Sequence, residues 1–249
     1  MKTFGLIGHR LGYSFSKKFF SEKFEKENLK EHEYVNFELD SIDEFPGIFK
    51  KNPNLAGLNC TIPYKQQIMK YLDEINPEAA EVGAVNTVKI IRKDGAMKLI
   101  GYNSDVYGFE NSLKPMLSEK HKKALILGTG GASKAIKYIL TKLGIEYISA
   151  SIEEQLFEKE IRYSDIDEQL IKERLIIINA TPLGTFPNVD NCADIPYQFI
   201  SSDHVLFDLV YNPEETLFMK KGKERGAAVK NGLEMLHLQA IRSWEIWNM

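Results

Sequence analysis

The stretch that decides the fold is "KKALILGTGGASKAIKYILTKLG", residues 122–144. An apolar run, a glycine turn and an amphipathic run follow one another, which predicts a strand, a tight turn and a helix that ends at Gly144. Gly128 and Gly130 let the backbone bend and approach a pyrophosphate, and the helix that follows offers N–H groups to phosphates. Such glycines also occur at ordinary strand–helix turns, but the βαβ context favours dinucleotide binding.

The rest of the second half repeats this alternation of strand and helix. Further apolar runs predict strands at 145–151 ("IEYISAS"), 175–181 ("LIIINAT") and 204–210 ("HVLFDLV"). Strands that alternate with helices are typical of an α/β domain with a parallel sheet. We therefore predict a Rossmann dinucleotide-binding domain over residues 105–232.

The first half, residues 1–104, predicts a second α/β domain. The expected elements are a strand at 3–9, a helix from Ser16 to Glu27, a strand at 33–39, a capping box at 41–44, a strand at 55–61 and a helix after Pro63. A hairpin turned at Asp94-Gly95 would add antiparallel strands to an otherwise parallel sheet. We expect the last helix, about 233–249, to pack back on this domain. Two such lobes predict a cleft between them, a common place for small-molecule sites.

Composition excludes several classes of protein. The 249 residues are 43% hydrophobic, enough for real cores, and a net charge of −3 gives no electrostatic footprint for nucleic acid or an anionic membrane. The N-terminus lacks a signal peptide, and no segment is long enough to span a bilayer. Two cysteines and five histidines show no disulfide framework or metal-ligand spacing. A cytoplasmic protein without a metal is expected.

Polar side chains recur at the predicted strand ends of the first half. They are Ser14, Ser16, Asn59, Thr61, Asn86 and Asp105. Hydroxyls and carboxamides suit a polyhydroxylated ligand because each can donate and accept hydrogen bonds. Singly, each has an ordinary explanation as a helix cap or turn residue, but their repetition favours one ligand site. Lys65 follows the strand at 55–61, and strand ends are where side chains of α/β folds reach ligands.

The motifs resemble those of the shikimate dehydrogenase family. In family order, the chain carries "SFS", "NCTIPYK", "GAVNTV", "NSDVYG", "GTGGAS", "NATPLG", "DLVYNPEET" and "NGLEMLHLQA". These stretches cover nearly the whole chain, and the second and last are highly specific. The resemblance implies reversible NADPH-dependent reduction of 3-dehydroshikimate to shikimate, in chorismate and aromatic amino-acid biosynthesis. It also implies a monomer or homodimer whose partners are small molecules.

The resemblance implies roles for individual residues as well. Lys65 and Asp105 match the catalytic pair. The positions that contact substrate correspond to Ser14, Ser16, Thr61, Asn86, Asp105, Tyr211 and Gln239. The positions that bind cofactor correspond to Gly128, Thr129, Gly130, Gly131, Ala132, Leu209 and Gly232. A cationic proton donor is chemically reasonable, because hydride delivery to a ketone builds negative charge on its oxygen.

The chain departs from the family pattern near the adenosine. Where the family commonly has Asn-Arg-Thr, whose arginine pairs with the 2′-phosphate of NADP, this chain has "SAS", residues 149–151, followed by Glu153 and Glu154. NADP remains the expected cofactor, with NAD possible and a smaller preference for NADP than in relatives that have the arginine. Ala150→Arg is expected to increase that preference.

Three alternatives remain open from the sequence. One is an NAD-dependent quinate/shikimate dehydrogenase, which an assay of quinate oxidation would distinguish. Another is an enzyme of the methylenetetrahydrofolate dehydrogenase type, against which "NGLEMLHLQA" argues. The third is a non-catalytic sensor of dinucleotide and ligand, against which the intact Lys65 and Asp105 argue.

Overall fold

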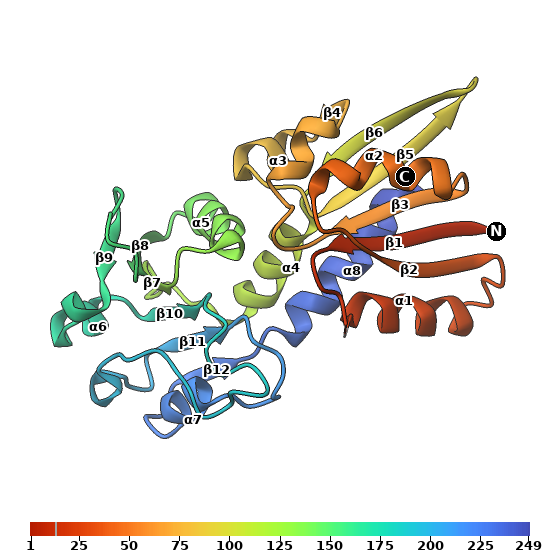
Figure 1. Ribbon diagram of the computed structural model, residues 1–249. Helices are drawn as coiled ribbons and strands as arrows, with labels where there is room; N and C mark the ends of the chain where they lie inside the picture. The colour runs from red at the N-terminus through yellow and green to blue at the C-terminus, as the bar shows by residue number, and fades with distance from the viewer. Residues whose placement is uncertain (13) are drawn as a thin grey trace. The chain divides into compact units, whose positions relative to one another are not determined.

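A computed structural model describes residues 1–12 and 14–249 of the chain. The chain forms two compact units: unit 1 comprises Met1–Tyr107 with Gln239–Met249, and unit 2 comprises Gly108–Leu238. Each unit has its own six-stranded sheet with helices on its faces (Figure 1). The predicted α/β fold class is confirmed.

The sheet of unit 1 is mixed, with the strand order β2-β1-β3-β5-β6-β4. Its strands are β1 (Lys2–Gly8), β2 (His32–Glu38), β3 (Leu55–Cys60), β4 (Glu74–Ile75), β5 (Thr87–Lys93) and β6 (Ala96–Tyr102). β1 is parallel to β2 and β3, whereas β5 is antiparallel to β3 and β6. The predicted hairpin is confirmed, since Asp94 and Gly95, both at positive φ, turn β5 into β6.

Helices cover both faces of this sheet. They are α1 (Phe15–Lys26), the 3₁₀ turn η1 (Ile42–Glu44), α2 (Phe45–Lys51), η2 (Gln67–Tyr71), α3 (Pro77–Val82), the start of α4 (Ser104–Leu113) and the end of α8 (Leu233–Asn248). On one face, Phe20 of α1 and Trp247 of α8 pack with Phe4. On the other, Phe45 of α2 packs in a cluster with Ile7, and Figure 1 shows α1 and α2 on opposite sides of the sheet. The two clusters exist because alternate side chains of a strand point to opposite faces.

The helix expected after Pro63 is present only as the short 3₁₀ helix η2, and no α-helix forms there. Residues 62–66 form turns, and only η2 follows them. The carbonyl of Lys65 accepts the N–H of Val85 at 2.7 Å, so it does not accept the N–H of Met69 as an α-helix would require. Lys65 therefore stands on a turn that is bonded to the segment before β5.

The sheet of unit 2 is parallel, with the strand order β12-β11-β10-β7-β8-β9. Its strands are β7 (Lys123–Leu127), β8 (Glu146–Ser151), β9 (Glu160–Arg162), β10 (Ile176–Asn179), β11 (Val205–Asp208) and β12 (Ala228–Lys230). Counted within the unit, the order is 6-5-4-1-2-3, which is that of a Rossmann sheet. The direction of winding reverses between β7 and β10, so a crevice is expected at their carboxyl ends.

Both faces of the unit 2 sheet are covered as well. The helices are α5 (Gly131–Lys142), α6 (Glu168–Glu173) and α7 (Leu217–Lys223), with the short turns η3 (Lys114–Met116), η4 (Tyr163–Asp165) and η5 (Tyr197–Phe199). Ile171 of α6 and Phe218 of α7 share one core cluster with Leu125 of β7, and Figure 1 shows α5 on the other face. Gly144 ends α5 at a φ of 68°, as predicted. The connection from β8 to β9, residues 152–159, contains no helix.

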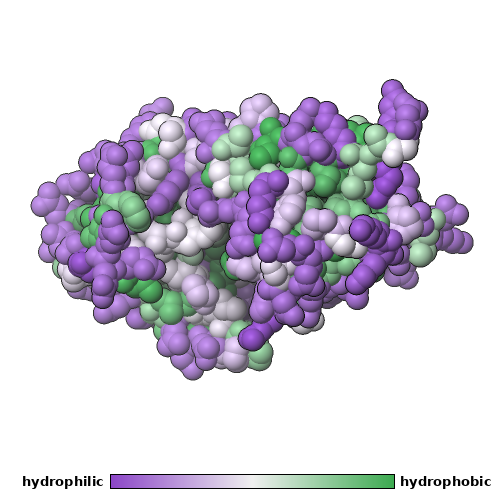
Figure 2. Space-filling view, turned by 45° about the horizontal axis from the view of Figure 1, so that its top comes forward, coloured by the Kyte–Doolittle hydropathy of each residue, from purple (hydrophilic) through white to green (hydrophobic). Residues whose placement is uncertain are grey.

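The outer surface is largely polar on the face seen in Figure 2, where apolar side chains form small patches between charged ones. Within the described ranges, every helix is too short or too polar to cross a membrane.

Gly57 sets how closely α8 approaches the unit 1 sheet. A Cβ at Gly57 would lie 2.5 Å from Cδ1 of Trp247, so we expect Gly57→Ala to lower the free energy of unfolding by about 1–3 kcal/mol. Urea denaturation followed by tryptophan fluorescence measures this loss. Gly47→Ala in α2 is the matched control, because a Cβ there meets nothing within 4 Å. An equal loss in both variants would contradict the packing explanation.

Candidate active site and dinucleotide-binding site

The polar residues predicted in the first half lie at one edge of the unit 1 sheet. β1, β3 and β6 end at this edge, and antiparallel β5 begins there, with Asn59 opposite Thr87 and Thr87 opposite Tyr102. The residues that follow or precede these strand ends are Ser14, Ser16, Thr61, Asn86 and Asp105. Because β5 is antiparallel to its neighbours, its amino end lies beside their carboxyl ends.

Lys65 and Asp105 form an ion pair at this edge. Nζ of Lys65 donates a hydrogen bond to Oδ2 of Asp105 at 2.7 Å, and the two side chains are 19% and 10% exposed. The turn that carries Lys65 is fixed by its bond to Val85. Asp105 lies in the first turn of α4, where the helix dipole favours a negative charge. An ammonium held in this way can donate a proton to an oxygen at the edge, or accept one in reverse.

Asn86 connects this pair to two helices. It is 2% exposed, its Oδ1 accepts the backbone N–H of Ser104 at 2.7 Å, and its Nδ2 donates to Oε1 of Gln239 at 3.1 Å. Since Ser104 precedes Asp105, the first bond also fixes the start of α4. The structure therefore brings Lys65, Asp105, Asn86 and Gln239 together in unit 1.

A buried network that the sequence analysis did not identify lies behind Asn86. The Tyr34 hydroxyl donates to Oδ1 of Asn59 at 2.8 Å, and Nδ2 of Asn59 donates to Oγ of Ser243 at 2.8 Å. Burial raises the pKa of Tyr34, so the phenol stays a neutral donor, and Ser16 hydrogen-bonds to it. The sequence did carry a signal for this network: a tyrosine inside an apolar strand and a serine inside a helix rich in aromatic residues.

Ser14 and Thr61 have simpler surroundings. Oγ of Ser14 accepts the N–H of Lys17 at 3.2 Å and caps α1, so the cap is Ser14 and not Ser16. The backbone N–H of Thr61 donates to the carbonyl of Ile7 at 2.9 Å, and its side chain is partly exposed. Their contacts with substrate stay predictions.

The crevice of unit 2 contains a cavity of about 600 Å³. Its lining comes from the glycine turn, from the segments after β8, β9 and β10, and from a later loop: Gly128, Thr129, Gly130, Ile152, Glu153, Tyr163, Ala180, Thr181, Pro182, Leu183, Cys192, Ala193 and Asp194. The carboxyl ends of β7 and β10 meet here, which is where a Rossmann sheet binds its dinucleotide.

The glycine turn fits a pyrophosphate. Gly128 has a φ of +99°, and a Cβ there would lie 2.8 Å from Cγ2 of Thr181, so no other residue suits the position. A Cβ at Gly130 or Gly131 would meet nothing within 4 Å, so open space lies over the turn. The 12-residue helix α5 begins here without a side-chain cap among the described residues, which leaves its first N–H groups for a phosphate.

The other residues predicted in the second half lie after β11. The N–H of Gly232 donates to the carbonyl of Val210 at 3.1 Å, and a Cβ on Gly232 would overlap the carbonyl of Leu209. Glycine is therefore required for this close approach of two segments. Leu209 and Tyr211 are partly exposed in unit 2. The assignment of Leu209 and Gly232 to the nicotinamide, and of Tyr211 to substrate, stays a prediction.

Position 150 does not suit the arginine that the sequence analysis would add there. Ala150 is fully buried in the core that packs under α6 and α7, so an arginine there would bury a charge. Its neighbour Ser151 points the other way, with Oγ 3.3 Å from Oγ1 of Thr129. Ile152, 87% exposed and part of the cavity lining, is the position from which an added arginine reaches the cavity.

Comparison with known proteins identifies the family of this chain. Residues 6–88 match the family model of the shikimate dehydrogenase substrate binding domain. The chain is 39% identical to the shikimate dehydrogenase (NADP(+)) of Methanococcus aeolicus, over 99% of this chain and 91% of that protein. It belongs to the shikimate dehydrogenase family. The resemblance drawn from the motifs is confirmed.

Solved structures of the shikimate dehydrogenase family and of a quinate dehydrogenase match the whole chain. The shikimate 5-dehydrogenase of Thermus thermophilus, in complex with NADP(H) and shikimate, has a TM-score of 0.83 at 28% identity, and the match covers 99% of this chain and 93% of that one. The quinate dehydrogenase of Corynebacterium glutamicum, in complex with NAD, has a TM-score of 0.85 at 26% identity, with the same coverage. The fold alone therefore does not separate the two activities.

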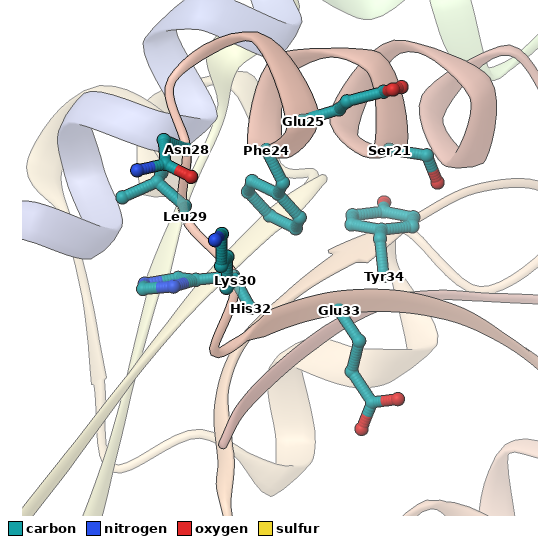
Figure 3. A pocket seen from close by; sticks show the side chains of 9 residues that line it. All are labelled: Ser21, Phe24, Glu25, Asn28, Leu29, Lys30, His32, Glu33 and Tyr34. Carbon is teal, nitrogen blue, oxygen red and sulfur yellow. The ribbon is translucent and has the colours of Figure 1, made fainter.

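A second cavity, of about 430 Å³, lies between α1 and the start of β2. The rings of Phe24 and Tyr34 lie between the helix and the strand, and Glu33 points away from the helix (Figure 3). The labelled side chains do not converge on one point. This cavity resembles a gap in surface packing more than a ligand site.

Asp208 supports the wall of the dinucleotide cavity. Its carboxylate accepts hydrogen bonds from Thr216 Oγ1 at 2.6 Å and Asn179 Nδ2 at 2.9 Å. Oδ1 of Asn179 accepts in turn from Oγ1 of Thr181, a lining residue, at 2.6 Å. Burial raises the pKa of Asp208 to about 6, against the opposing effect of these hydrogen bonds.

The raised pKa of Asp208 makes stability depend on pH. The folded protein binds this proton more tightly than the unfolded chain, whose carboxyl keeps its ordinary pKa of 3.8, so the contribution is complete below that pH and is lost as pH rises through 6. We expect a loss of about 1 kcal/mol between pH 5 and 7 that Asp208→Asn removes. Urea denaturation followed by circular dichroism measures it. Parallel pH curves for the two proteins would exclude Asp208 as the titrating group.

Proposed function

We propose that the chain is an NADP-dependent shikimate dehydrogenase, which reversibly reduces 3-dehydroshikimate to shikimate in chorismate and aromatic amino-acid biosynthesis. The observation that carries the proposal is the Lys65–Asp105 pair at 2.7 Å, fixed beside Asn86 and Gln239. Relatives with this named activity align over nearly the full length of the chain.

The chemistry at this edge follows from the ion pair. When NADPH is bound in unit 2, its nicotinamide supplies the hydride. The ketone oxygen of the substrate gains negative charge as it is reduced, and the Lys65 ammonium stabilises that charge and donates its proton. Asp105 holds the ammonium in place and accepts a hydrogen bond from a neighbouring ring hydroxyl. In the oxidative direction Lys65 accepts the proton.

Residues 1–104 and the returning helix 233–249 bind most of the substrate, to which Asp105 and Tyr211 contribute, and the rest of residues 105–232 binds the cofactor. Oε1 of Gln239 is engaged by Asn86, so Nε2 of Gln239 is the group that donates to a substrate oxygen. The remaining substrate contacts come from Ser14, Ser16, Thr61 and Tyr211. The pyrophosphate lies on Gly128, Thr129, Gly130, Gly131 and Ala132, and the nicotinamide end lies near Leu209 and Gly232.

We place this activity in the cytoplasm, in a monomer or homodimer. Both Cys60 and Cys192 are free thiols, which suits a reducing compartment. Gel filtration with light scattering distinguishes the two oligomeric states.

The second candidate is an NAD-dependent quinate dehydrogenase, favoured by the match to such an enzyme and by Glu153 in the cavity lining. Initial rates with shikimate and quinate, each with NADP⁺ and NAD⁺, separate the candidates through the absorbance of the reduced nicotinamide. We expect the highest kcat/KM for shikimate with NADP⁺. The proposal would be overturned if the protein oxidised quinate but not shikimate, or if it used NAD⁺ but not NADP⁺.

Lys65→Ala should lower kcat by about 10²–10⁴-fold while shikimate binding changes little, because its proton transfer acts in the transition state. Asp105→Asn should lower kcat and also weaken shikimate binding. Steady-state kinetics and calorimetric titration measure both effects. Lys70→Ala, at a 60% exposed lysine of η2, is the matched control. Near-normal turnover of Lys65→Ala would exclude this residue as the proton donor.

Thr61→Val and Gln239→Ala should each raise the KM for shikimate, since polar groups of the ligand lose their partners, at about 1–3 kcal/mol each. The Kd for NADP⁺ should stay the same, because neither residue belongs to unit 2. Equal weakening for both ligands would indicate a folding defect, and the substrate assignments would then be withdrawn.

A further inference from the structure

A 2′-phosphate needs a cation that β8 and residues 152–158 of the loop after it do not provide. The phosphate on the adenosine ribose distinguishes NADP from NAD, and in a Rossmann domain this ribose lies beyond the end of the second strand, here β8. Residues 145–158 contain no lysine or arginine. Glu153, which lines the cavity, would repel the phosphate. The cation therefore has to come from another element.

Strand β9 brings an arginine to this place. β8 and β9 are parallel, with Ser151 directly opposite Arg162, so the two side chains lie on the same face of the sheet. Ser151 is the residue whose Oγ approaches Thr129 of the glycine turn at 3.3 Å, which makes this the face toward the dinucleotide. No helix lies in the connection 152–159, and Arg162 is exposed.

The guanidinium of Arg162 lies against the loop after β8, next to residues that line the cavity. Its Nη2 donates to the backbone carbonyl of Glu154 at 3.1 Å, which holds it against the loop after β8. The sequence neighbours of the two bonded residues line the cavity: Glu153 precedes Glu154, and Tyr163 follows Arg162. In residues 1–12 and 14–249 it has no carboxylate partner. Only part of its five N–H donors is used, so others remain for two phosphate oxygens.

We propose that Arg162 binds the ribose 2′-phosphate of NADP, with the Ser151 hydroxyl beside it, and so supplies from β9 the cation that is missing after β8. The proposal rests on the NADP-linked function proposed above.

Lys134 is the other cation to consider. One turn later on α5, Nζ of Lys137 lies 3.5 Å from Oε1 of Glu160 in β9. Lys134 is on the same face of the helix and is therefore directed toward β9 as well. Among the described residues nothing fixes its ammonium at the edge of the cavity, whereas a carbonyl fixes Arg162. Lys159 lies before β9, with Nζ 5.2 Å from the centre of the Tyr147 ring, and it serves as a matched control for the loss of one charge.

The test measures binding to the full chain by calorimetric titration with NADP⁺, NAD⁺ and 2′,5′-ADP. Arg162→Gln should raise the Kd for NADP⁺ and 2′,5′-ADP by about 10–100-fold and change the Kd for NAD⁺ by less than about 2-fold. Lys159→Gln should leave all three unchanged. Ile152→Arg adds a cation at the edge of the cavity and should lower the Kd for NADP⁺. This variant is the positive control, because it shows that the measurement detects an added cation.

Three results would overturn the proposal. The NADP⁺ to NAD⁺ ratio could stay the same in Arg162→Gln, both cofactors could weaken equally, or Lys134→Gln could show the selective loss instead. Binding of 2′,5′-ADP requires no turnover, so this outcome is separate from that of the proposed function. Arg162-dependent binding of 2′,5′-ADP in a protein inactive on shikimate would refute the substrate and keep the inference.

Discussion

The bond on which the active edge depends joins the carboxamide of Asn86 to the backbone N–H of Ser104, at 2.7 Å in a buried site. It fixes the start of α4, and with it Asp105, against the beginning of β5. The other end of the same side chain reaches Gln239 of α8. A buried amide that loses its partners costs about 1–3 kcal/mol, so the position of three elements is coupled to one residue. This coupling helps to keep the Lys65–Asp105 pair in one geometry.

The two units offer different kinds of partner to a polar ligand. Unit 1 offers side chains, backed by a buried network of Tyr34, Asn59 and Ser243 whose donors and acceptors are matched. Unit 2 offers the backbone, because the glycines after β7 leave the N–H groups of α5 open. Hydroxyl positions on a ring require directional partners, whereas a pyrophosphate is bound by charge and close approach.

Most of the architecture could be predicted because its signals are local. Apolar runs marked the strands, Asp94-Gly95 marked the hairpin, and the glycine turn marked the Rossmann domain, all within short windows of sequence. The two corrected predictions have separate physical causes. The segment after Pro63 does not form an α-helix because a residue twenty positions later, Val85, takes the carbonyl of Lys65. Position 150 was chosen for an added arginine because the end of a strand is uncertain by a residue when it is read from sequence. A shift of one residue along a strand moves the side chain to the opposite face of the sheet.

The sequence by itself determined the family, the two α/β domains and the residue types of the candidate site, since these depend on motifs and hydrophobic periodicity. Only the tertiary structure decided which groups meet. Ser243 meets Asn59 across 184 positions, and Arg162 meets the end of β8 because two parallel strands are in register. Neither contact leaves a mark in local sequence, because strand order and register are set by packing of the whole sheet, and burial then selects which polar side chains must be paired.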